Sequence, residues 1–385
     1  MRALRLSRFA VAVSALAIAG SVAGAQTITN LGVLPGGTTS QAVAVSADGG
    51  AAAGTVDIFG PGQARGFRWT SSQGLTDVGA LPSSTGTWLN AISSDGDSVA
   101  GIGFLNSGFQ HAVRWTRRGG LTDLGVLAGG NASEAYGISG NGGVVVGVST
   151  TATSFHAFRW TQRTGMQDIG TLPGGTYSFA FAVSASGTAV TGYADTAAAE
   201  EHAFFWTARG GVQDLGTINA GESSSGNAIG AEGGSVAGYS GNQAALWRNG
   251  RVRGLGTLTG GNFTVGYAIS AGGRVVAGTG DDANGNVVAT LWTRNLGMVD
   301  LNVFLPTVGV DLTGWQLAVA AGLSADGSTI VGRGTYNGEA RAWLVRMPRG
   351  WRFGNVGTGN GGGNDCHDGD DDDDDDDHDF HDCHR

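Results

Sequence analysis

The amino-acid sequence predicts an all-β protein, a seven-bladed β-propeller of four-stranded blades. Three observations support this prediction. Nearly identical text, such as "HAFRWTQRTGMQDIGTLPGGT" at 156–176, recurs every 40 to 54 residues, and two glycines keep a constant spacing inside every copy. Glycine accounts for 71 of 385 residues and helical periodicity is missing, which disfavours helices. A period of this length is typical of a four-stranded propeller blade.

Seven copies of the repeat share the same landmarks. A turn glycine follows text such as "VSADG", from Gly49 to Gly327, and a second glycine comes five residues later, from Gly54 to Gly332. Stretches such as "SEAYGIS", "GVVVGVS", "HAFRWT" and "GLTDLGVL" give four predicted strands per copy, separated by turn residues. The third of these strands ends in a tryptophan: Trp69, Trp115, Trp160, Trp206, Trp247, Trp292 and Trp343.

The phase of the repeat predicts how the ring closes. The text "TITNLGVLPGG" has the form of a fourth strand without three strands before it, and the seventh copy ends at Trp343 without a fourth strand. We therefore expect an N-terminal strand, at about 27–34, to complete the last blade and leave no exposed sheet edge. The alternative closing strand is "GWRFGNV", at 350–356.

Small residues mark the places where neighbouring blades should touch. Ala or Gly stands five residues before each turn glycine, as at Ala44 and Gly137, and three residues before each tryptophan, as at Gly66 and Ala157. Burial between adjacent blades is needed because ordering each residue costs about 1–2 kcal/mol of backbone entropy.

The two ends of the chain differ from the repeats. Residues 1–25 combine arginines, an apolar run and a small-residue cleavage pattern, which is typical of a secretory signal peptide; a retained membrane anchor is the alternative. We expect the propeller at 26–353, a Gly/Asn-rich linker at 354–364 and a disordered acidic tail at 365–385. The mature protein is then exported, to the periplasm, the cell surface or the medium, without a transmembrane segment.

The tail suggests a chemistry of its own. Eight consecutive aspartates, Asp370 to Asp377, lie between Cys366 and Cys383, which are disulfide candidates in an exported protein. We expect either a solubilising tail or weak binding of Ca²⁺ or Zn²⁺, and no other cofactor. The candidate ligands are His367, Asp370, Asp377, His378, His381 and His384.

Composition excludes several classes of function. All 22 basic residues are arginine, which excludes lysine Schiff-base chemistry and the phosphate-loop lysine. The net charge of −10 comes mainly from the tail, and a nearly neutral body with an acidic tail argues against nucleic acid as a partner. The motifs G-x-S-x-G, H-E-x-x-H and S-x-x-K are missing. We therefore expect a protein that is not an enzyme.

The loops between the second and third strands vary most among the copies. Variable loops on a rigid frame are the usual place for recognition, although ordinary drift in exposed loops would give the same pattern. The candidate binding residues in these loops are Phe59, Phe104, Phe109, Glu200, Glu201, Asp281 and Tyr336.

Two kinds of polar residue recur with the repeat. His111, His156 and His202 hold the same place in successive copies. A ring of imidazoles would bind metal or titrate, but we favour strand-end histidines satisfied by backbone or water. The aspartates of the "TDLG" text and its variants are expected to cap turns; they are Asp77, Asp123, Asp168 and Asp214.

The text "HAFRWT", "HAFFWT" and "DIGTLPGGTYSFAFAVSASG" resembles the HAF-repeat family of bacterial extracellular proteins, over about residues 27–346. The resemblance implies an exported β-repeat protein of unassigned activity and carries over no catalytic residues. We expect a non-catalytic binding or surface-associated module that recognises an unknown protein or surface glycan through its loops. The alternatives are a hydrolase or lyase acting at the central channel and a structural component of the cell envelope or matrix.

Overall fold

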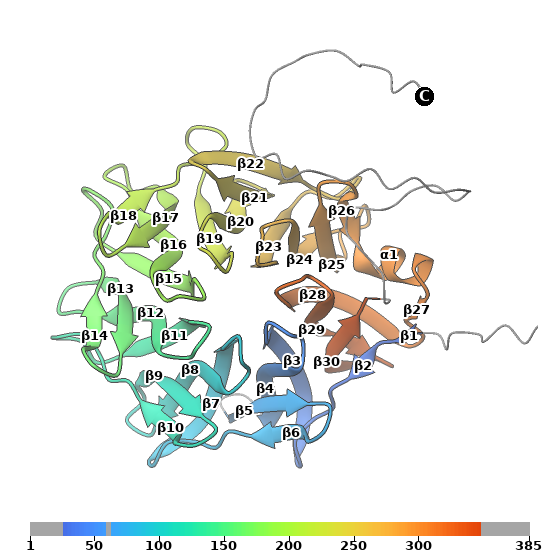
Figure 1. Ribbon diagram of the computed structural model, residues 1–385, viewed down its shortest axis with the longest axis horizontal. Coiled ribbons are helices and arrows are strands. Elements are labelled where there is room, and N and C mark those ends of the chain that lie inside the picture. Colours follow the sequence, from blue (N-terminus) through green and yellow to red (C-terminus); the bar gives the residue numbers. More distant parts are fainter. Residues whose placement is uncertain (1–25, 59–62, 348–385) are drawn as a thin grey trace, which may run out of the picture.

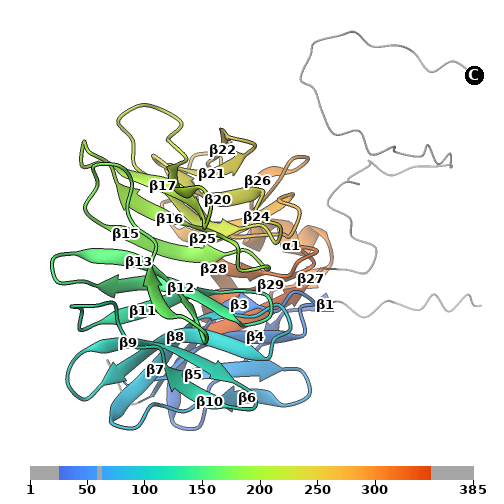
Figure 2. The same ribbon diagram turned by 60° about the vertical axis from the view of Figure 1, so that its left-hand side comes forward.

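The predicted propeller is confirmed. A computed structural model describes residues 26–58 and 63–347, and in it seven four-stranded antiparallel sheets surround a central axis (Figures 1 and 2). Blade 1 contains β3 (Gly37–Val45), β4 (Ala51–Ile58), β5 (Ala64–Thr70) and β6 (Gly74–Asp77). Blade 2 contains β7 (Ser84–Ile92), β8 (Ser98–Leu105), β9 (Gln110–Thr116) and β10 (Gly120–Asp123).

The next four blades repeat this order of strands. Blade 3 contains β11 (Ser133–Ile138), β12 (Val144–Thr150), β13 (Phe155–Thr161) and β14 (Gly165–Asp168). Blade 4 contains β15 (Ser178–Val183), β16 (Ala189–Asp195), β17 (Glu201–Thr207) and β18 (Gly211–Asp214). Blade 5 contains β19 (Ser224–Ile229), β20 (Ser235–Ser240), β21 (Gln243–Arg248) and β22 (Arg251–Gly256). Blade 6 contains β23 (Thr264–Ile269), β24 (Val275–Asp281), β25 (Val287–Thr293) and β26 (Gly297–Asp300).

The N-terminal strand closes the ring, as the phase of the repeat predicts. Blade 7 contains β28 (Trp315–Leu323), β29 (Thr329–Tyr336) and β30 (Glu339–Arg346), and its fourth strand is β2 (Thr29–Asn30), antiparallel to β30. The backbone N–H of Leu31 extends this pairing by donating to the carbonyl of Ala342 at 3.0 Å. The preceding β1 (Gln26–Thr27) pairs in parallel with β27 (Val310–Asp311). The alternative closing segment, 350–356, lies outside the described residues.

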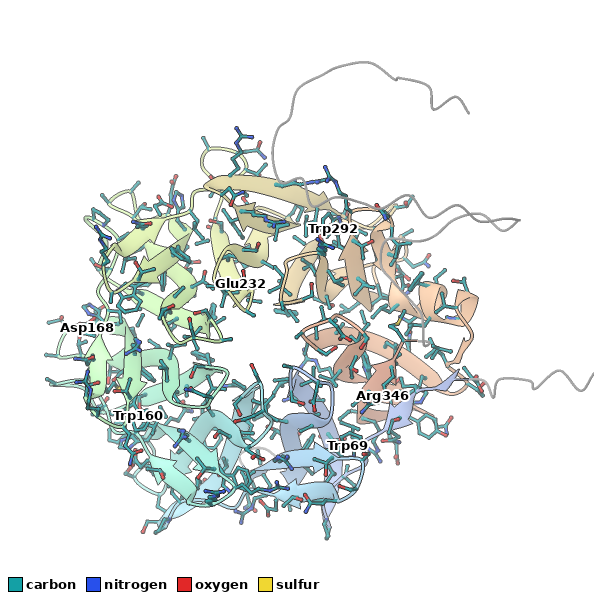
Figure 3. All side chains as sticks on the ribbon, viewed as in Figure 1. Trp69, Trp160, Asp168, Glu232, Trp292 and Arg346 are labelled. Atoms are coloured by element: carbon teal, nitrogen blue, oxygen red, sulfur yellow. The ribbon has the colours of Figure 1, made fainter. Side chains whose placement is uncertain are left out.

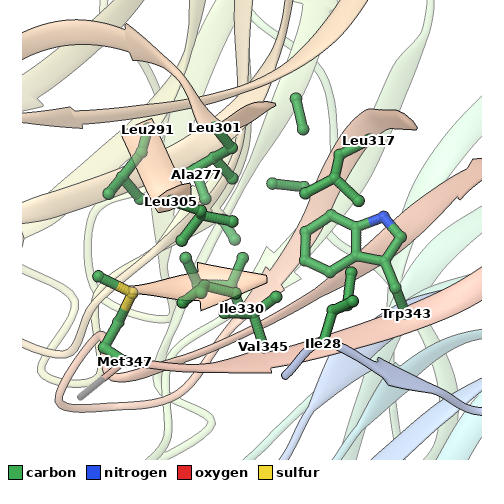
Figure 4. Packing of buried hydrophobic residues seen from close by; sticks show 14 of the residues in the cluster. Ile28, Ala277, Leu291, Leu301, Leu305, Leu317, Ile330, Trp343, Val345 and Met347 are labelled. Carbon is green, nitrogen blue, oxygen red and sulfur yellow. The ribbon is translucent and has the colours of Figure 1, made fainter. Parts of the chain in front are cut away.

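One helix interrupts the all-β pattern, although the sequence analysis expects none. Helix α1 (Leu301–Thr307) follows blade 6, and its N-cap Asp300 accepts a hydrogen bond from the Asn302 N–H. Seven residues are too short for helical periodicity to register in a sequence window. Leu301 and Leu305 are fully buried in a cluster that includes Ile28 and Trp343 (Figure 4). The helix therefore helps to fix the closing strand.

A β-bulge in each inner strand explains the second glycine of every repeat. The pairing register shifts at an equivalent place in all seven blades, for example between Ala135 and Gly137 of β11, opposite Gly147 of β12, and blades 1, 2 and 7 have a second shift near the start of the inner strand. A Cβ at Gly147 would overlap the carbonyl oxygen of Glu134. Because a bulge leaves one residue unpaired and redirects its side chain, Tyr136 is displaced from the ladder. Glycine is required opposite the bulge for lack of space.

Backbone hydrogen bonds also connect the blades around the axis. At six of the seven junctions the turn between first and second strands donates to the turn of the next blade, as Ala47 does to Ser94, and Ala325 of blade 7 donates back to the carbonyl of Ala47 at 2.9 Å. Arginine side chains form further connections: Arg114 Nε donates to the Gly142 carbonyl of the next blade at 2.7 Å. The close approach expected at small residues is present, because a Cβ at Gly137 would lie 3.1 Å from the Ala182 Cα in blade 4.

The remaining predicted regions are not described. The signal peptide at 1–25, the linker at 354–364 and the tail at 365–385 lie outside the described residues. Within the part of the chain that the structure describes, no helix is long and apolar enough to cross a membrane.

Candidate functional site

The predicted loop residues do not form a common site. Phe109, with 44% of its surface exposed, closes the β8–β9 hairpin, where its carbonyl accepts from Leu105 N–H at 2.9 Å; Phe104 is half-buried in the same hairpin. Tyr336 packs against Trp315, with ring centroids 4.9 Å apart. Phe104 and Phe109 belong to blade 2 and Tyr336 belongs to blade 7, so these three residues do not form one cluster. Phe59 lies outside the described residues.

Two adjacent carboxylates from the predicted set do have polar partners. Glu201 accepts a hydrogen bond from the Tyr177 hydroxyl at 3.0 Å, and Glu200 lies 3.6 Å from Nε2 of His202. Glu201 begins β17 and Glu200 directly precedes it, while Tyr177 directly precedes β15, the first strand of the same blade. The two glutamates therefore border the site described below.

Asp281 is a structural residue rather than an exposed binding residue, which corrects the prediction. It is buried, and its Oδ1 accepts the backbone N–H groups of Asn262 and Phe263 at 2.6 and 2.8 Å. These hydrogen bonds, led by the one from Phe263, hold the pKa of Asp281 below its ordinary value. In blade 4, the equivalent Asp195 accepts hydrogen bonds from the backbone N–H groups of Thr176 and Tyr177.

The three repeated histidines are separate structural pairs, not a ring. The Nδ1 atoms of His111, His156 and His202 lie 2.8, 2.6 and 2.9 Å from carboxylate oxygens of Asp123, Asp168 and Asp214. The partner is therefore a carboxylate instead of the expected backbone or water.

The other carboxylate oxygen of each aspartate caps the turn that follows, as predicted. In Asp123, for example, Oδ1 accepts from Gly125 N–H at 2.8 Å. No group of three His, Cys, Asp or Glu residues able to hold a metal ion occurs within 26–58 and 63–347. The tail ligands predicted at His367, Asp370, Asp377, His378, His381 and His384, and Cys366 and Cys383, lie outside these ranges.

The bulges form a ring of side chains around the central channel. The residue inserted by each bulge lines a cavity of about 220 Å³ on the axis, together with its neighbours on the seven inner strands. We call these seven residues the bulge ring: Val43, Asn90, Tyr136, Phe181, Asn227, Tyr267 and Ala321. The ring is asymmetric, because aromatic and amide side chains occupy blades 2 to 6 and small apolar ones occupy blades 7 and 1.

None of the residues that line this channel carries a charge. The two amides are fixed by the following blade: Asn90 Nδ2 donates to the Ala135 carbonyl at 2.8 Å, and Asn227 Nδ2 donates to the Gly266 carbonyl at 3.0 Å. Tyr267 is 41% exposed. The channel thus presents aromatic faces and preoriented amides without a cation or an anion among its lining residues.

An aromatic wall extends from the bulge ring towards the loops between second and third strands. Tyr136 and Phe181 meet edge to face at 5.3 Å between centroids, and Phe181 lies 5.5 Å from Tyr193. Tyr193 stacks on Phe179 at 5.0 Å, and Phe179 stacks on Phe155 at 5.9 Å. The aromatic wall also includes Tyr177, which meets Phe179 and Tyr193 edge to face.

Two carboxylates contact the tyrosines of the aromatic wall. The Tyr136 hydroxyl donates to Glu134, and that of Tyr177 donates to Glu201. Burial, followed by the hydrogen bond to Glu201, raises the pKa of Tyr177 to about 12, and burial raises the pKa of Tyr193 to about 12. The pKa of Tyr136 is also raised, chiefly by burial. These hydroxyls therefore stay protonated and remain hydrogen-bond donors at neutral pH.

The bulge ring is not among the predicted sites, although the sequence carries a signal for it. Each ring residue stands six positions before the turn glycine. The next position is Ala or Gly in every copy of the repeat, as Gly137 follows Tyr136. The residue type varies at the ring position within an otherwise constant repeat. Without knowledge of the bulge, strand alternation alone does not assign these side chains to the channel.

Comparisons with known proteins support the fold. No family model and no curated protein matches this chain. Among solved structures, an oligogalacturonate lyase in complex with manganese is similar, with 13% identity and a TM-score of 0.55, over 84% of this chain and 93% of that chain. The oligogalacturonate lyase of Vibrio parahaemolyticus has 9% identity and a TM-score of 0.54, over 84% and 94%. TolB of Acinetobacter baumannii has 12% identity and a TM-score of 0.44; the alignment covers 67% of this chain and 61% of TolB.

The comparison contradicts the prediction of a non-catalytic loop-binding module. Propellers that this chain covers almost completely include lyases, so the fold does not by itself support a non-catalytic role. The prediction relied on missing catalytic motifs, and such motifs belong to other folds. A repeated sequence motif that builds the blades therefore does not indicate a non-catalytic role.

Proposed function

We propose that the central channel is a substrate site for the end of a neutral oligosaccharide. The observation that carries the proposal is the uncharged bulge ring, with aromatic side chains at Tyr136, Phe181 and Tyr267 and amides at Asn90 and Asn227. Sugar rings combine apolar C–H faces, which pack on aromatic rings, with hydroxyls, which need fixed donors and acceptors. Ligand sites in general pair an apolar lining with a few placed polar groups.

The size of the channel favours a single sugar unit over a long segment. Its volume of about 220 Å³ is smaller than the roughly 300–1,000 Å³ of pockets for drug-sized ligands. The aromatic wall would then support the next units of the chain outside the channel. Phe155, which is 50% exposed, is the outermost ring of that path.

The absence of charge from the channel lining argues against a polyanionic substrate. Oligogalacturonate, the substrate named for two similar structures, carries a carboxylate on each unit, and carboxylates are bound by arginine or lysine. For a cleaving reaction, Glu134 is the candidate general base, because its carboxylate accepts a hydrogen bond from a channel-lining side chain, Tyr136. Acid–base carboxylates are the usual catalytic groups of glycoside hydrolysis.

The test is calorimetric titration with neutral gluco-, xylo- and chito-oligosaccharides, followed by mass spectrometry of the products. We expect saturable binding of a neutral series, and the variant Phe181→Ala should weaken it about tenfold or more, as loss of a buried aromatic contact does. Val43→Ala changes the equivalent ring position in blade 1 and should bind as the wild type does. Cleavage, where products form, should be lost in Glu134→Gln.

Binding of oligogalacturonate in preference to every neutral series would overturn the proposal. The same holds if Phe181→Ala and Val43→Ala have equal effects, since the aromatic half of the ring would then have no special part in binding.

We further propose that the chain belongs to the HAF-repeat family and is exported. The support is the repeat text and the signal-peptide pattern at 1–25. Mass spectrometry of the protein expressed in a Gram-negative host should find a mature N-terminus at Gln26. An uncleaved Met1 in the exported fraction would contradict this proposal.

A further inference from the structure

A second cavity lies between blades 3 and 4, away from the channel mouth. Its volume is about 570 Å³, and its lining includes Arg159, Gln167, Asp168, Thr188, Trp206 and Arg209. It includes the turn between β15 and β16 and the turn between β17 and β18. These turns lie at the opposite strand ends from the loops beside the aromatic wall. Figure 3 shows Asp168 at the outer part of the ring.

The two arginines of this cavity lack a carboxylate partner among the described residues. Arg159 is half-buried, and its Nε and Nη2 atoms donate to the Gly187 carbonyl at 3.2 and 3.1 Å. Arg209 is exposed and has no recorded hydrogen bond or ion pair. The Asp168 carboxylate also lines the cavity, but its oxygens bond to His156 Nδ1 and Gly170 N–H. Burial without a counter-ion lowers the pKa of Arg159.

The junction between blades 1 and 2 shows that a carboxylate can occupy this place, although Asp97 is the only acidic residue directly after a turn glycine in the seven copies. Arg68 is equivalent to Arg159, since its Nε donates to the Gly96 carbonyl as Arg159 does to Gly187. Asp97, directly after Gly96, lies 3.8 Å from Arg68 and 3.5 Å from Arg117, which stands two residues after Trp115. One carboxylate therefore neutralises two guanidinium groups at that junction.

The junction between blades 3 and 4 has no such internal carboxylate. Thr188 occupies the place of Asp97, directly after its turn glycine, and Ala208 occupies the place of Arg117, two residues after Trp206. Compared with the junction between blades 1 and 2, the negative charge is missing and one side chain is shorter, while Arg159 is present and Arg209 lines the same cavity. The result is a cavity with cationic walls, hydroxyl groups and an indole.

We infer that this cavity binds an oxyanion carried on a ring, a carboxylate or phosphate group placed where Asp97 lies at the equivalent junction. Guanidinium groups match the geometry of both anions. The half-buried Trp206 offers an apolar face to the ring, and Gln167 and Thr188 offer polar groups to its substituents. This site is independent of the neutral-sugar site proposed for the channel.

The test is calorimetric titration of the full chain with glucuronic acid, glucose 6-phosphate and neutral glucose. Thr188→Asp introduces a carboxylate at the place of Asp97 and should weaken binding of the acidic probes by tenfold or more, whereas the neutral Thr188→Asn should keep it within about threefold. Thr188 is exposed, so both variants should fold. Arg209→Gln should also weaken binding about tenfold. A preference between the two acidic probes identifies the oxyanion.

The inference is overturned if neither acidic probe binds saturably, or if glucose binds this cavity equally well. It is also overturned if Thr188→Asp and Thr188→Asn bind alike. Phe181→Ala, which alters the channel, should leave binding of the acidic probes unchanged, so failure of one site is distinguishable from failure of the other.

Discussion

Substitution of Leu31 by alanine tests whether the N-terminal segment holds the ring closed. Leu31 is 5% exposed and belongs to a cluster that contains Phe67 and Trp69 of blade 1 and Leu344 of blade 7. Its side chain therefore lies at the seam between the first and the last blade. Loss of this side chain should weaken the contact on which closure of the whole ring depends.

The magnitude follows from the burial of Leu31. Leucine to alanine removes three carbon atoms, worth about 0.8 kcal/mol each, or roughly 2.4 kcal/mol in total. The cavity left at the seam adds to this, because buried leucine-to-alanine substitutions cost about 2–5 kcal/mol. We expect a loss of about 3–4 kcal/mol, which is a large part of the 5–15 kcal/mol typical of a folded protein.

Urea unfolding followed by tryptophan fluorescence and circular dichroism measures this loss. With an m-value of about 3 kcal/mol per molar urea, the midpoint should fall by about 1 M. Because a closed ring unfolds as a unit, both probes should shift together. The control is Val303→Ala in α1, where the side chain is 68% exposed and the cost should stay below about 0.5 kcal/mol.

Equal midpoints for Leu31→Ala and Val303→Ala would refute this reasoning. So would an early, separate transition that leaves the main one unchanged, because the seam would then fray without opening the ring.

Three further predictions concern the repeat frame. Gly147→Ala should cost about 1–3 kcal/mol in chemical unfolding, because the bulge fills the space for a Cβ; Gly234→Ala, where that space is open, should cost less than about 1 kcal/mol. Burial acts to raise the pKa of Asp195, but the hydrogen bonds that its carboxylate accepts outweigh burial and lower that pKa. The ionised carboxylate therefore stabilises the folded state above about pH 4, and this stabilisation is lost as the pH falls further. Asp195→Asn should therefore flatten the acid side of a melting-temperature profile, and an unchanged slope would contradict this. His156→Ala should cost less than about 1 kcal/mol in urea unfolding, because its pair with Asp168 is partly exposed; a larger loss would show that the pair fixes the blade.

Most of the frame could be predicted from the sequence because its causes are local. Strand alternation, turn glycines such as Gly142 and the spacing of the tryptophans each depend on a few neighbouring residues. The closure by residues 29–31 was also predictable, because a fourth strand is missing after Trp343 and present before Gly37. Helix α1 was not, since two helical turns leave too little periodicity to detect.

The sites were decided by the tertiary structure. A bulge shifts pairing by one residue and so changes which side chain faces the axis; without it, Tyr136 and Phe181 have no reason to share a channel. They stand 45 positions apart in the sequence, and only closure of the ring brings them to 5.3 Å. The cavity beside Arg159 likewise depends on two residues of another blade, Thr188 and Ala208. Local sequence determines each strand, but packing between blades determines what the strands present to a ligand.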